Sequence, residues 1–308
     1  MRKATLILTA IIVLASIFAG CGGEKKLAGN YAETGVKLSY APAVGKTFYY
    51  RSDSDDLTEF SEKGYSQSTL SKSTSYQAFV VDYVRSDTTS VTYSFLYEDV
   101  GVFQNEAFQK SEEQSDLIGQ KLTIVIDPEG KLVSWSGLSD IESDGSGIDR
   151  GEMIASNYGS IFFDYFPPEP LKVGSKWTRD NAMNVTTKDG DLTQKTTKDY
   201  EVLDFVEYKG RPTAKCRVNI TILNVGEGTV EDKDGKQYAY FNEGKGQGKG
   251  TVYFDFESGI PVYSTFNWIV DFTITSVDQE TQEKNEFRYY NEQKVSYNLA
   301  NESDVPKK

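Results

Sequence analysis

Histidine is absent from the 308 residues of this chain, and only two cysteines are present. Without histidine the chain cannot build a Ser-His-Asp triad, a His-ligated zinc or iron site, or a histidine general base. Basic residues are also outnumbered, with 33 lysines and arginines against 46 acidic residues and a formal charge of −13. This balance excludes the basic footprint of a nucleic-acid-binding protein, so we expect no nucleic-acid partner.

The N-terminus carries the pattern of a secretory signal peptide over residues 1–20. Arg2 and Lys3 are followed by an apolar run, Ala4–Phe18, which is short for a membrane span. The run ends in Phe18-Ala19-Gly20-Cys21, which resembles the lipobox of bacterial lipoproteins, with phenylalanine where leucine is usual. The resemblance implies cleavage between Gly20 and Cys21 and attachment of lipid to Cys21. The alternative is an ordinary signal peptide that happens to contain Cys21.

Residues 21–34 are predicted to be the lipidated cysteine and its tether. Gly22–Asn30 has the composition of a flexible coil, which would span roughly 15–18 Å. Loss of Arg2 and Lys3 takes the side-chain charge from −13 to −15, which disfavours a second, electrostatic attachment to anionic lipid. We therefore expect an exported protein whose membrane partner is reached through Cys21. Glycine rather than aspartate at position 22 favours the outer membrane if the envelope is Gram-negative.

The second cysteine lies in a strand-like run. Ala214–Ile222 has apolar residues at even positions and polar ones at odd positions, the period of a strand with one buried face. Cys216 is therefore expected to be a buried thiol without a disulfide partner. A nucleophilic role would need an activating base, and histidine is absent.

Four landmarks recur in the same order 124 to 129 residues apart. They are Val44–Phe48 with Val173–Trp177, Tyr76 with Tyr200, Thr123–Asp127 with Thr251–Asp255, and Gly130 with Gly259. Their collinearity predicts an internal duplication. The predicted organisation is a first β repeat over 35–147, a bridging helix over 148–168, a second β repeat over 169–300 and a tail over 301–308.

Alternating hydrophobicity predicts a mainly β fold, with two tandem related antiparallel units that form a curved sheet or partial barrel. The longest run, Ile260–Ile274, would extend about 50 Å as a strand, so it is expected to bend or bulge. Asp189-Gly190 and Asp234-Gly235 predict hairpin turns.

Two segments have the periodicity of helices. Apolar residues at helical spacing between Ile148 and Tyr165, followed by Pro167, predict one main helix that bridges the two copies. A shorter helix is expected over 105–118, with Gly119 as its stop.

Several motifs support a likeness that covers most of residues 35–276. A proline-rich segment, Phe166–Lys172, leads into Val173-Gly174-x-x-Trp177, and Gly250–Asp255 follows later in the chain. This combination resembles a family of exported bacterial proteins, many of them lipoproteins, that is known only as a domain of unknown function. Ser175-Lys176 stands where that pattern commonly carries Asp-Ser. The resemblance implies export and a β-rich fold, and it transfers no catalytic residue.

An acidic segment suggests the start of a calcium loop, with Asp140, Glu142 and Asp144 at alternate positions. The twelfth position, which should be acidic, is Gly151, and the hydrophobic eighth is Gly147. We therefore expect a solvated connection and no bound metal or other cofactor.

The glycine-rich run Gly244–Gly250 invites comparison with phosphate-binding loops. It matches neither established spacing of glycines, and no helix is expected after it. Alternating glycines are more typical of a loop or a thin, bulged strand edge.

The function best supported by these patterns is a non-enzymatic envelope lipoprotein that binds a partner or ligand through a curved sheet. Three alternatives remain: a carrier of lipid or another hydrophobic ligand, an assembly subunit that contacts other envelope proteins, and a hydrolase that uses two carboxylates. The carrier would need an apolar cavity, the subunit an exposed apolar patch, and the hydrolase an acid pair roughly 5–10 Å apart in a cleft.

Lipid attachment can be tested by replacing Cys21 with serine. Because only the cysteine thiol accepts the diacylglyceryl group, Cys21→Ser should abolish labelling of the protein by a radioactive fatty acid. The unmodified chain, expressed in parallel, is the control, and a variant that remains labelled would refute the prediction.

Overall fold

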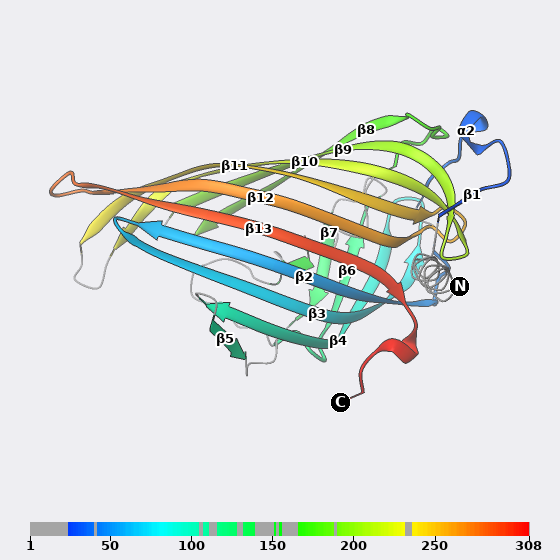
Figure 1. Cartoon of the computed structure of the whole chain (residues 1–308), viewed down its shortest axis with the longest axis horizontal. Coiled ribbons are helices and arrows are strands. Elements are labelled where there is room, and N and C mark those ends of the chain that lie inside the picture. The colour runs from blue at the N-terminus through cyan, green and yellow to red at the C-terminus, as the bar shows by residue number, and fades with distance from the viewer. Residues whose placement is uncertain are drawn as a thin grey trace, which may run out of the picture.

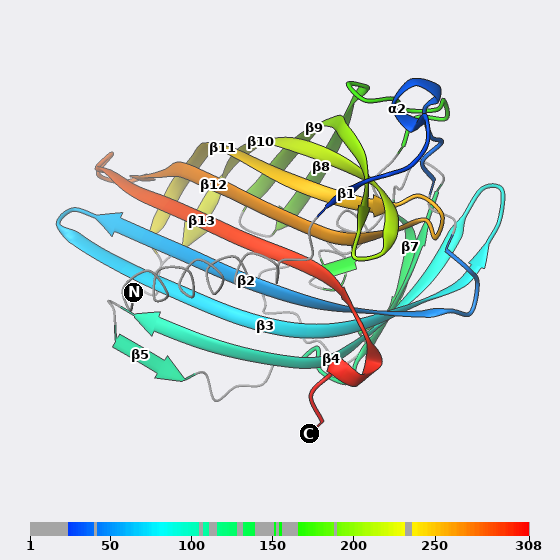
Figure 2. The same cartoon turned by 45° about the vertical axis from the view of Figure 1, so that its right-hand side comes forward.

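The computed structural model describes residues 24–39, 42–104, 107–110, 116–127, 132–138, 151, 154–155, 166–187, 190–231 and 236–307. Within them, thirteen strands form one antiparallel sheet, which confirms the prediction of a mainly β fold. The sheet is strongly curved and open, and its long strands run along the long axis of the molecule (Figures 1 and 2). We call the face that carries the buried core the inner face and the opposite one the outer face.

The first half of the chain supplies strands β1 to β7 and one short helix. In the sheet, β2, β3, β4, β6 and β7 are neighbours in chain order, and β5 pairs with β4. The bounds are β1 Lys25–Lys26, α2 Tyr31–Thr34, β2 Thr47–Glu62, β3 Tyr65–Val84, β4 Thr89–Gln104, β5 Ala107–Lys110, β6 Lys121–Ile126 and β7 Leu132–Gly137.

The second half supplies β8 to β13. Strands β8 to β12 again follow one another in chain order, and β13 lies between β12 and β2, so it joins the two halves into one sheet. The bounds are β8 Lys176–Thr187, β9 Gly190–Tyr208, β10 Arg211–Glu231, β11 Gln237–Asp255, β12 Ile260–Asp278, β13 Lys284–Ala300 and the 3-10 turn η1 Glu302–Asp304.

The landmarks of the predicted duplication occupy equivalent places in the two halves. Gly45 precedes β2 and its amide donates to the carbonyl of Val81, while Gly174 precedes β8 and its amide donates to Val202, both at 2.8 Å. Both glycines have positive φ, 76° and 83°, a conformation that favours glycine. The duplication itself stays a prediction. Gly130 lies outside the described residues.

The predicted helices differ from the structure. Of the bridging helix, Gly151, Ile154 and Ala155 are described and helical, whereas 166–168 are not helical, and no long helix connects the halves within the described part of the chain. The helix expected over 105–118 is wrong where it can be checked: β5 is a strand and 116–119 form a turn. The apolar residues have helical spacing, but residues 107–110 form a strand because they pair with β4.

A hairpin of β8 and β9 occurs where Asp189-Gly190 predicted one. Thr187 of β8 pairs with Gly190, which is the first residue of β9 and not part of the connection. Lys188 and Asp189 lie outside the described residues. Asp234-Gly235 lies in the connection between β10 and β11, also outside the described residues. None of the described helices is long and apolar enough to cross a membrane.

The core consists of two apolar clusters on the inner face, one under each half of the sheet. Val91, Leu122 and Ile124 are fully buried in the first half, as are Val202, Ala214 and Val218 in the second. Each buried Val, Leu or Ile side chain among them contributes roughly 1.5–3 kcal/mol, and Ala214 contributes less. Tyr297 of β13 packs against both clusters, and so links them.

A buried aspartate organises the turn between β11 and β12. Asp255, at 2% exposure, accepts hydrogen bonds from the amides of Glu257 and Ser258 and from Arg211 at 2.9 Å. Burial alone would raise the pKa of Asp255, but the hydrogen bonds from Ser258, Arg211 and Glu257 outweigh it and lower that pKa. Asp255 is therefore a structural residue.

The sequence suggested that the glycine-rich run Gly244–Gly250 is a loop or a strand edge, and this prediction is wrong. The run lies within β11, with β10 on one side and β12 on the other. Gly244, Gly246, Gly248 and Gly250 face the inner side and are opposite Phe272, Val270, Trp268 and Phe266 of β12. A Cβ on Gly244 would lie 2.0 Å from Cβ of Phe272, and one on Gly248 would lie 2.6 Å from Cβ of Trp268. The glycines therefore make room for the large side chains of β12.

This close approach predicts that Gly248→Ala destabilises the protein. The added methyl would force β12 to shift, so we expect the free energy of unfolding in urea to fall by about 1–3 kcal/mol. Gln247→Ala, on the outer face of the same strand, is the matched control and should change it by less than about 0.5 kcal/mol. Equal free energies of unfolding for the two variants would contradict the close packing of Gly248 against Trp268.

Candidate ligand-binding surface

An aromatic strip continues the apolar inner face from the core toward the hairpin ends of the long strands. We define it as Phe60 of β2, Trp268 and Phe272 of β12, and Phe287 and Tyr289 of β13. Phe272 stacks on Tyr289 with ring centroids 4.6 Å apart, and Phe60 stacks on Phe287 at 5.8 Å. Each of the five side chains is partly exposed. Partly exposed stacked rings offer a surface to an apolar molecule.

Register explains why these residues share a face. Tyr289 of β13 is opposite both Phe272 and Phe60, on the two neighbouring strands. Opposite residues of antiparallel strands lie on the same side of a sheet. Trp268 and Phe272 also pack against the core cluster of the second half, which fixes that side as the inner one.

A polar network borders the aromatic strip on the same face. The amide of Asn291 donates to Oδ1 of Asp56 at 2.7 Å and to Oγ1 of Thr58 at 3.2 Å. Thr58 in turn donates to the same carboxylate oxygen at 3.1 Å. The inner face thus combines an apolar strip with one partly buried acceptor group, the usual make-up of a site for an amphipathic ligand.

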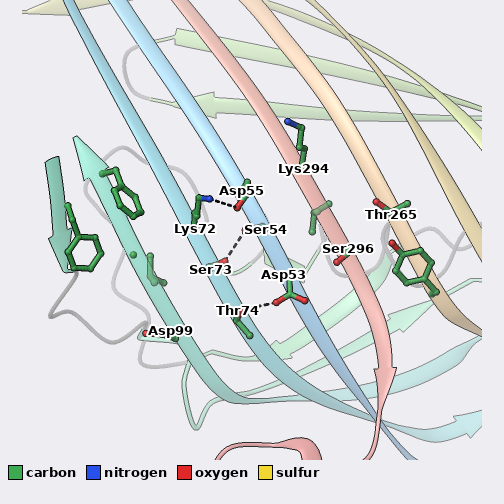
Figure 3. A pocket seen from close by; sticks show the side chains of 16 residues that line it. Asp53, Ser54, Asp55, Lys72, Ser73, Thr74, Asp99, Thr265, Lys294 and Ser296 are labelled. Carbon is green, nitrogen blue, oxygen red and sulfur yellow. Dashed lines mark hydrogen bonds and ion pairs between the residues drawn. The ribbon is translucent and has the colours of Figure 1, made fainter. Parts of the chain in front are cut away.

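The outer face carries a shallow hollow of about 720 Å³ across β2, β3, β4, β12 and β13. Figure 3 shows Lys72 reaching toward Asp55 and Thr74 toward Asp53 across neighbouring strands. Lys72 Nζ lies 4.0 Å from Asp55 Oδ1, and Thr74 donates to Asp53 at 2.8 Å. Arg51 also donates to Asp53, at 2.7 Å. Exposed cross-strand pairs of this kind stabilise a sheet only slightly.

The hollow does not have the features of the carboxylate hydrolase that the sequence left open. Asp53, Asp55 and Asp99 line it, but it is wide and solvated. The Asp53 carboxylate accepts hydrogen bonds from Arg51 and Thr74, so it takes part in contacts that hold neighbouring side chains of the sheet.

Metal and phosphate sites receive no support from the described residues. No cluster of three or more acidic or cysteine side chains among them could hold a metal ion. The calcium-loop candidates Asp140, Glu142 and Asp144 lie outside the described residues, as do Gly20 and Cys21.

Cys216 is placed as predicted. Its side chain is 2% exposed within the core cluster of the second half, and the thiol is free. Burial raises the pKa of the Cys216 thiol to about 12. It is thus a small apolar core residue.

The sequence contained part of the signal for the aromatic strip. Alternation along Ile260–Ile274 placed Trp268 and Phe272 on the same face of one strand. Nothing in the sequence showed that β12, β13 and β2 are neighbours, because β2 pairs with a strand more than 200 residues away.

Comparisons with known proteins give distant likenesses to solved structures. No family model and no curated protein matches the chain. A solved structure of lipovitellin, described as showing lipid–protein interactions, matches with a TM-score of 0.43 and 10% identity over 85% of this chain. The chain spans 26% of that lipovitellin chain.

Two other solved structures match with lower TM-scores. OccK5 of Pseudomonas aeruginosa matches with a TM-score of 0.25 and 6% identity, over 84% of this chain and all of its own. OccAB4 of Acinetobacter baumannii matches with a TM-score of 0.22 and 8% identity, over 83% of this chain and 99% of its own. TM-scores and identities this low do not establish a shared fold or function.

The burial of Cys216 predicts an unreactive thiol. At pH 8 only about one thiol in 10⁴ would be ionised with a pKa near 12, so the native protein should not react with a thiol-specific dye. Unfolding in guanidinium should restore full reactivity, which serves as the control. Rapid reaction of the folded Cys21→Ser variant would contradict the burial.

Proposed function

We propose that the protein is an exported, lipid-anchored envelope protein that binds an apolar or amphipathic molecule on the inner face of its sheet without catalysing a reaction. The observation that carries the proposal is the aromatic strip, where the apolar face continues beyond the buried core. If the apolar residues of this face served only to form the core, they would not extend beyond its buried part, because exposed apolar surface costs free energy.

The dimensions and chemistry of the strip favour an acyl chain. From Trp268 to Phe287, which is opposite Ile274, the strip extends six residues along β12, or about 20 Å, comparable with an extended acyl chain. Asp56, which Asn291 and Thr58 hold beside the strip, would accept a hydrogen bond from a hydroxyl or amine in the ligand headgroup. The ligand class is therefore a lipid with a hydrogen-bond donor in its headgroup.

The N-terminal pattern supports the proposed location. A positive start, an apolar run and Phe18-Ala19-Gly20-Cys21 fall in the order that lipoprotein export requires. Cys21 would carry the lipid, and cleavage would follow Gly20.

A second candidate, an assembly subunit, is favoured by exposed aromatic side chains. Phe108 of β5 is 60% exposed and Phe241 of β11 is 58% exposed, and neither belongs to the aromatic strip. Such a subunit would lose its partner on Phe241→Ser and would keep any lipid bound to the strip.

The binding proposal is tested by titrating the purified full chain with a brominated monoacylglycerol, whose hydroxyls can donate to Asp56, and following tryptophan fluorescence. Bromine near the strip should quench Trp268, and Phe272→Ala should weaken binding about tenfold through loss of its ring contact. Thr273→Ala, the adjacent outer-face change, should bind like the unaltered chain. Unquenched fluorescence, together with a ligand-free mass in native mass spectrometry, would refute the proposal.

A further inference from the structure

The first described residues are bound to the sheet and do not form the free tether that the sequence suggested. Lys25 and Lys26 form β1, which pairs with Glu207 and Val206 at the edge of β9. The next residues cross to the inner side, because Leu27 and Tyr31 pack against the core cluster of the second half. The segment predicted to be a coil is docked on the sheet, because β1 supplies hydrogen-bond partners to the backbone at an otherwise unpaired part of β9.

Glu24 fixes the beginning of this segment on the outer face. Its carboxylate accepts hydrogen bonds from Lys215 at 2.7 Å and from the hydroxyl of Tyr253 at 2.5 Å. These hydrogen bonds lower the pKa of Glu24, so its charge and the contact persist at neutral pH. Lys25 adds an ion pair with Glu207 at 3.6 Å.

Cys21 precedes Glu24 by three residues, which can span at most about 11 Å. A lipid on Cys21 would therefore hold this end of the sheet at the bilayer surface. Figures 1 and 2 show β1 at the end of the molecule opposite the β2–β3 and β12–β13 hairpins.

Three tyrosines cluster on the outer face beside Glu24. Tyr208 stacks on Tyr253 with centroids 4.1 Å apart, and Tyr263 lies 6.0 Å from both. Tyr208 and Tyr263 are partly exposed. We call these residues the tyrosine cluster. Tyrosine is favoured at a membrane interface because its ring is apolar and its hydroxyl is polar.

The charges around the tyrosine cluster are largely balanced. Lys215 pairs with Glu24, Lys25 with Glu207, and Arg217 with Glu201. Farther from the cluster the outer face presents Glu243 on β11 and Glu292 on β13, and these charged groups favour water. We therefore expect a bilayer surface to contact the end of the sheet that carries the tyrosine cluster, and not the rest of the outer face.

We propose that the tyrosine cluster rests on the headgroup region of the phospholipid bilayer that holds Cys21, so that the protein stands end-on with its hairpins farthest from the membrane. The inference rests on the proposed lipid anchor and adds an orientation to it. The aromatic strip then lies toward the distal end, away from the membrane surface.

The test uses the full lipidated chain in phosphatidylcholine vesicles that contain a lipid with a nitroxide on its headgroup. Lys249→Cys, Lys245→Cys and Phe241→Cys place a bimane probe at three exposed outer-face positions of β11. These lie about 13, 26 and 40 Å along the strand from Tyr253. Cys21 is blocked by its lipid and Cys216 is buried, so each variant offers one reactive thiol.

Quenching by the nitroxide should be strongest at position 249, weaker at 245 and at background at 241. The same gradient is expected when anionic phosphatidylglycerol is added, because the contact is uncharged. Equal quenching at the three positions, a reversed gradient, or quenching that requires anionic lipid would overturn the inference. Tyr208→Ser should weaken the gradient, whereas Tyr290→Ser, on the outer face of β13, should leave it unchanged.

Flotation of the vesicles separates this inference from the proposed anchor. If the unaltered chain floats with the vesicles and Cys21→Ser does not, the anchor holds, and an absent gradient then refutes the orientation alone. If the unaltered chain carries no lipid and does not float, the proposed anchor fails and the orientation fails with it.

Discussion

The structure depends on the pairing of β13 with β12 on one side and with β2 on the other. Without β13, the meander of β2 to β7 and that of β8 to β12 would each expose a long unpaired edge. Unpaired backbone amides and carbonyls are costly when shielded from water and promote aggregation when exposed. Because β13 comes last in the chain, one continuous sheet can form only after both halves are present.

The same strand pairing creates the surface on which function is proposed. It aligns Phe60, Tyr289 and Phe272 across three strands, although Phe60 is more than 200 residues from the others in the chain. The glycines of β11 have a complementary part, since they remove the side chains that would collide with Trp268 and Phe272. Absence of a side chain at one strand thus permits large aromatic ones on the next.

The net negative charge of the protein is not spread evenly, because acidic and basic side chains pair at the β1 end of the sheet. The proposed processing would leave a side-chain charge near −15, which makes broad contact with an anionic membrane unfavourable. At the β1 end, however, acidic and basic side chains pair, and the tyrosine cluster lies among them. This pairing is the basis of the proposal that the β1 end approaches lipid without relying on charge and is held by a single lipid at Cys21.

Strand content could be predicted from the sequence because alternation of apolar and polar residues acts over a few residues. The period of Ala214–Ile222 correctly buried Cys216, and the run Ile260–Ile274 became most of β12. Helical spacing misled over 105–118, where pairing of β5 with β4 decided the conformation. Gly244–Gly250 was misread as a loop or edge, because its role depends on Phe272 and Trp268 on the neighbouring strand.

The sequence by itself determined that the fold is mainly β, which face is apolar in runs such as Ala214–Ile222, and that no histidine chemistry is possible. Only the tertiary structure decided that β13 joins the halves, that the aromatic strip assembles from three strands, and that Glu24 binds Lys215 and Tyr253. The physical reason is range. Side-chain period and turn preference are local, whereas strand order and docking of the N-terminal segment depend on pairing between residues more than 200 positions apart.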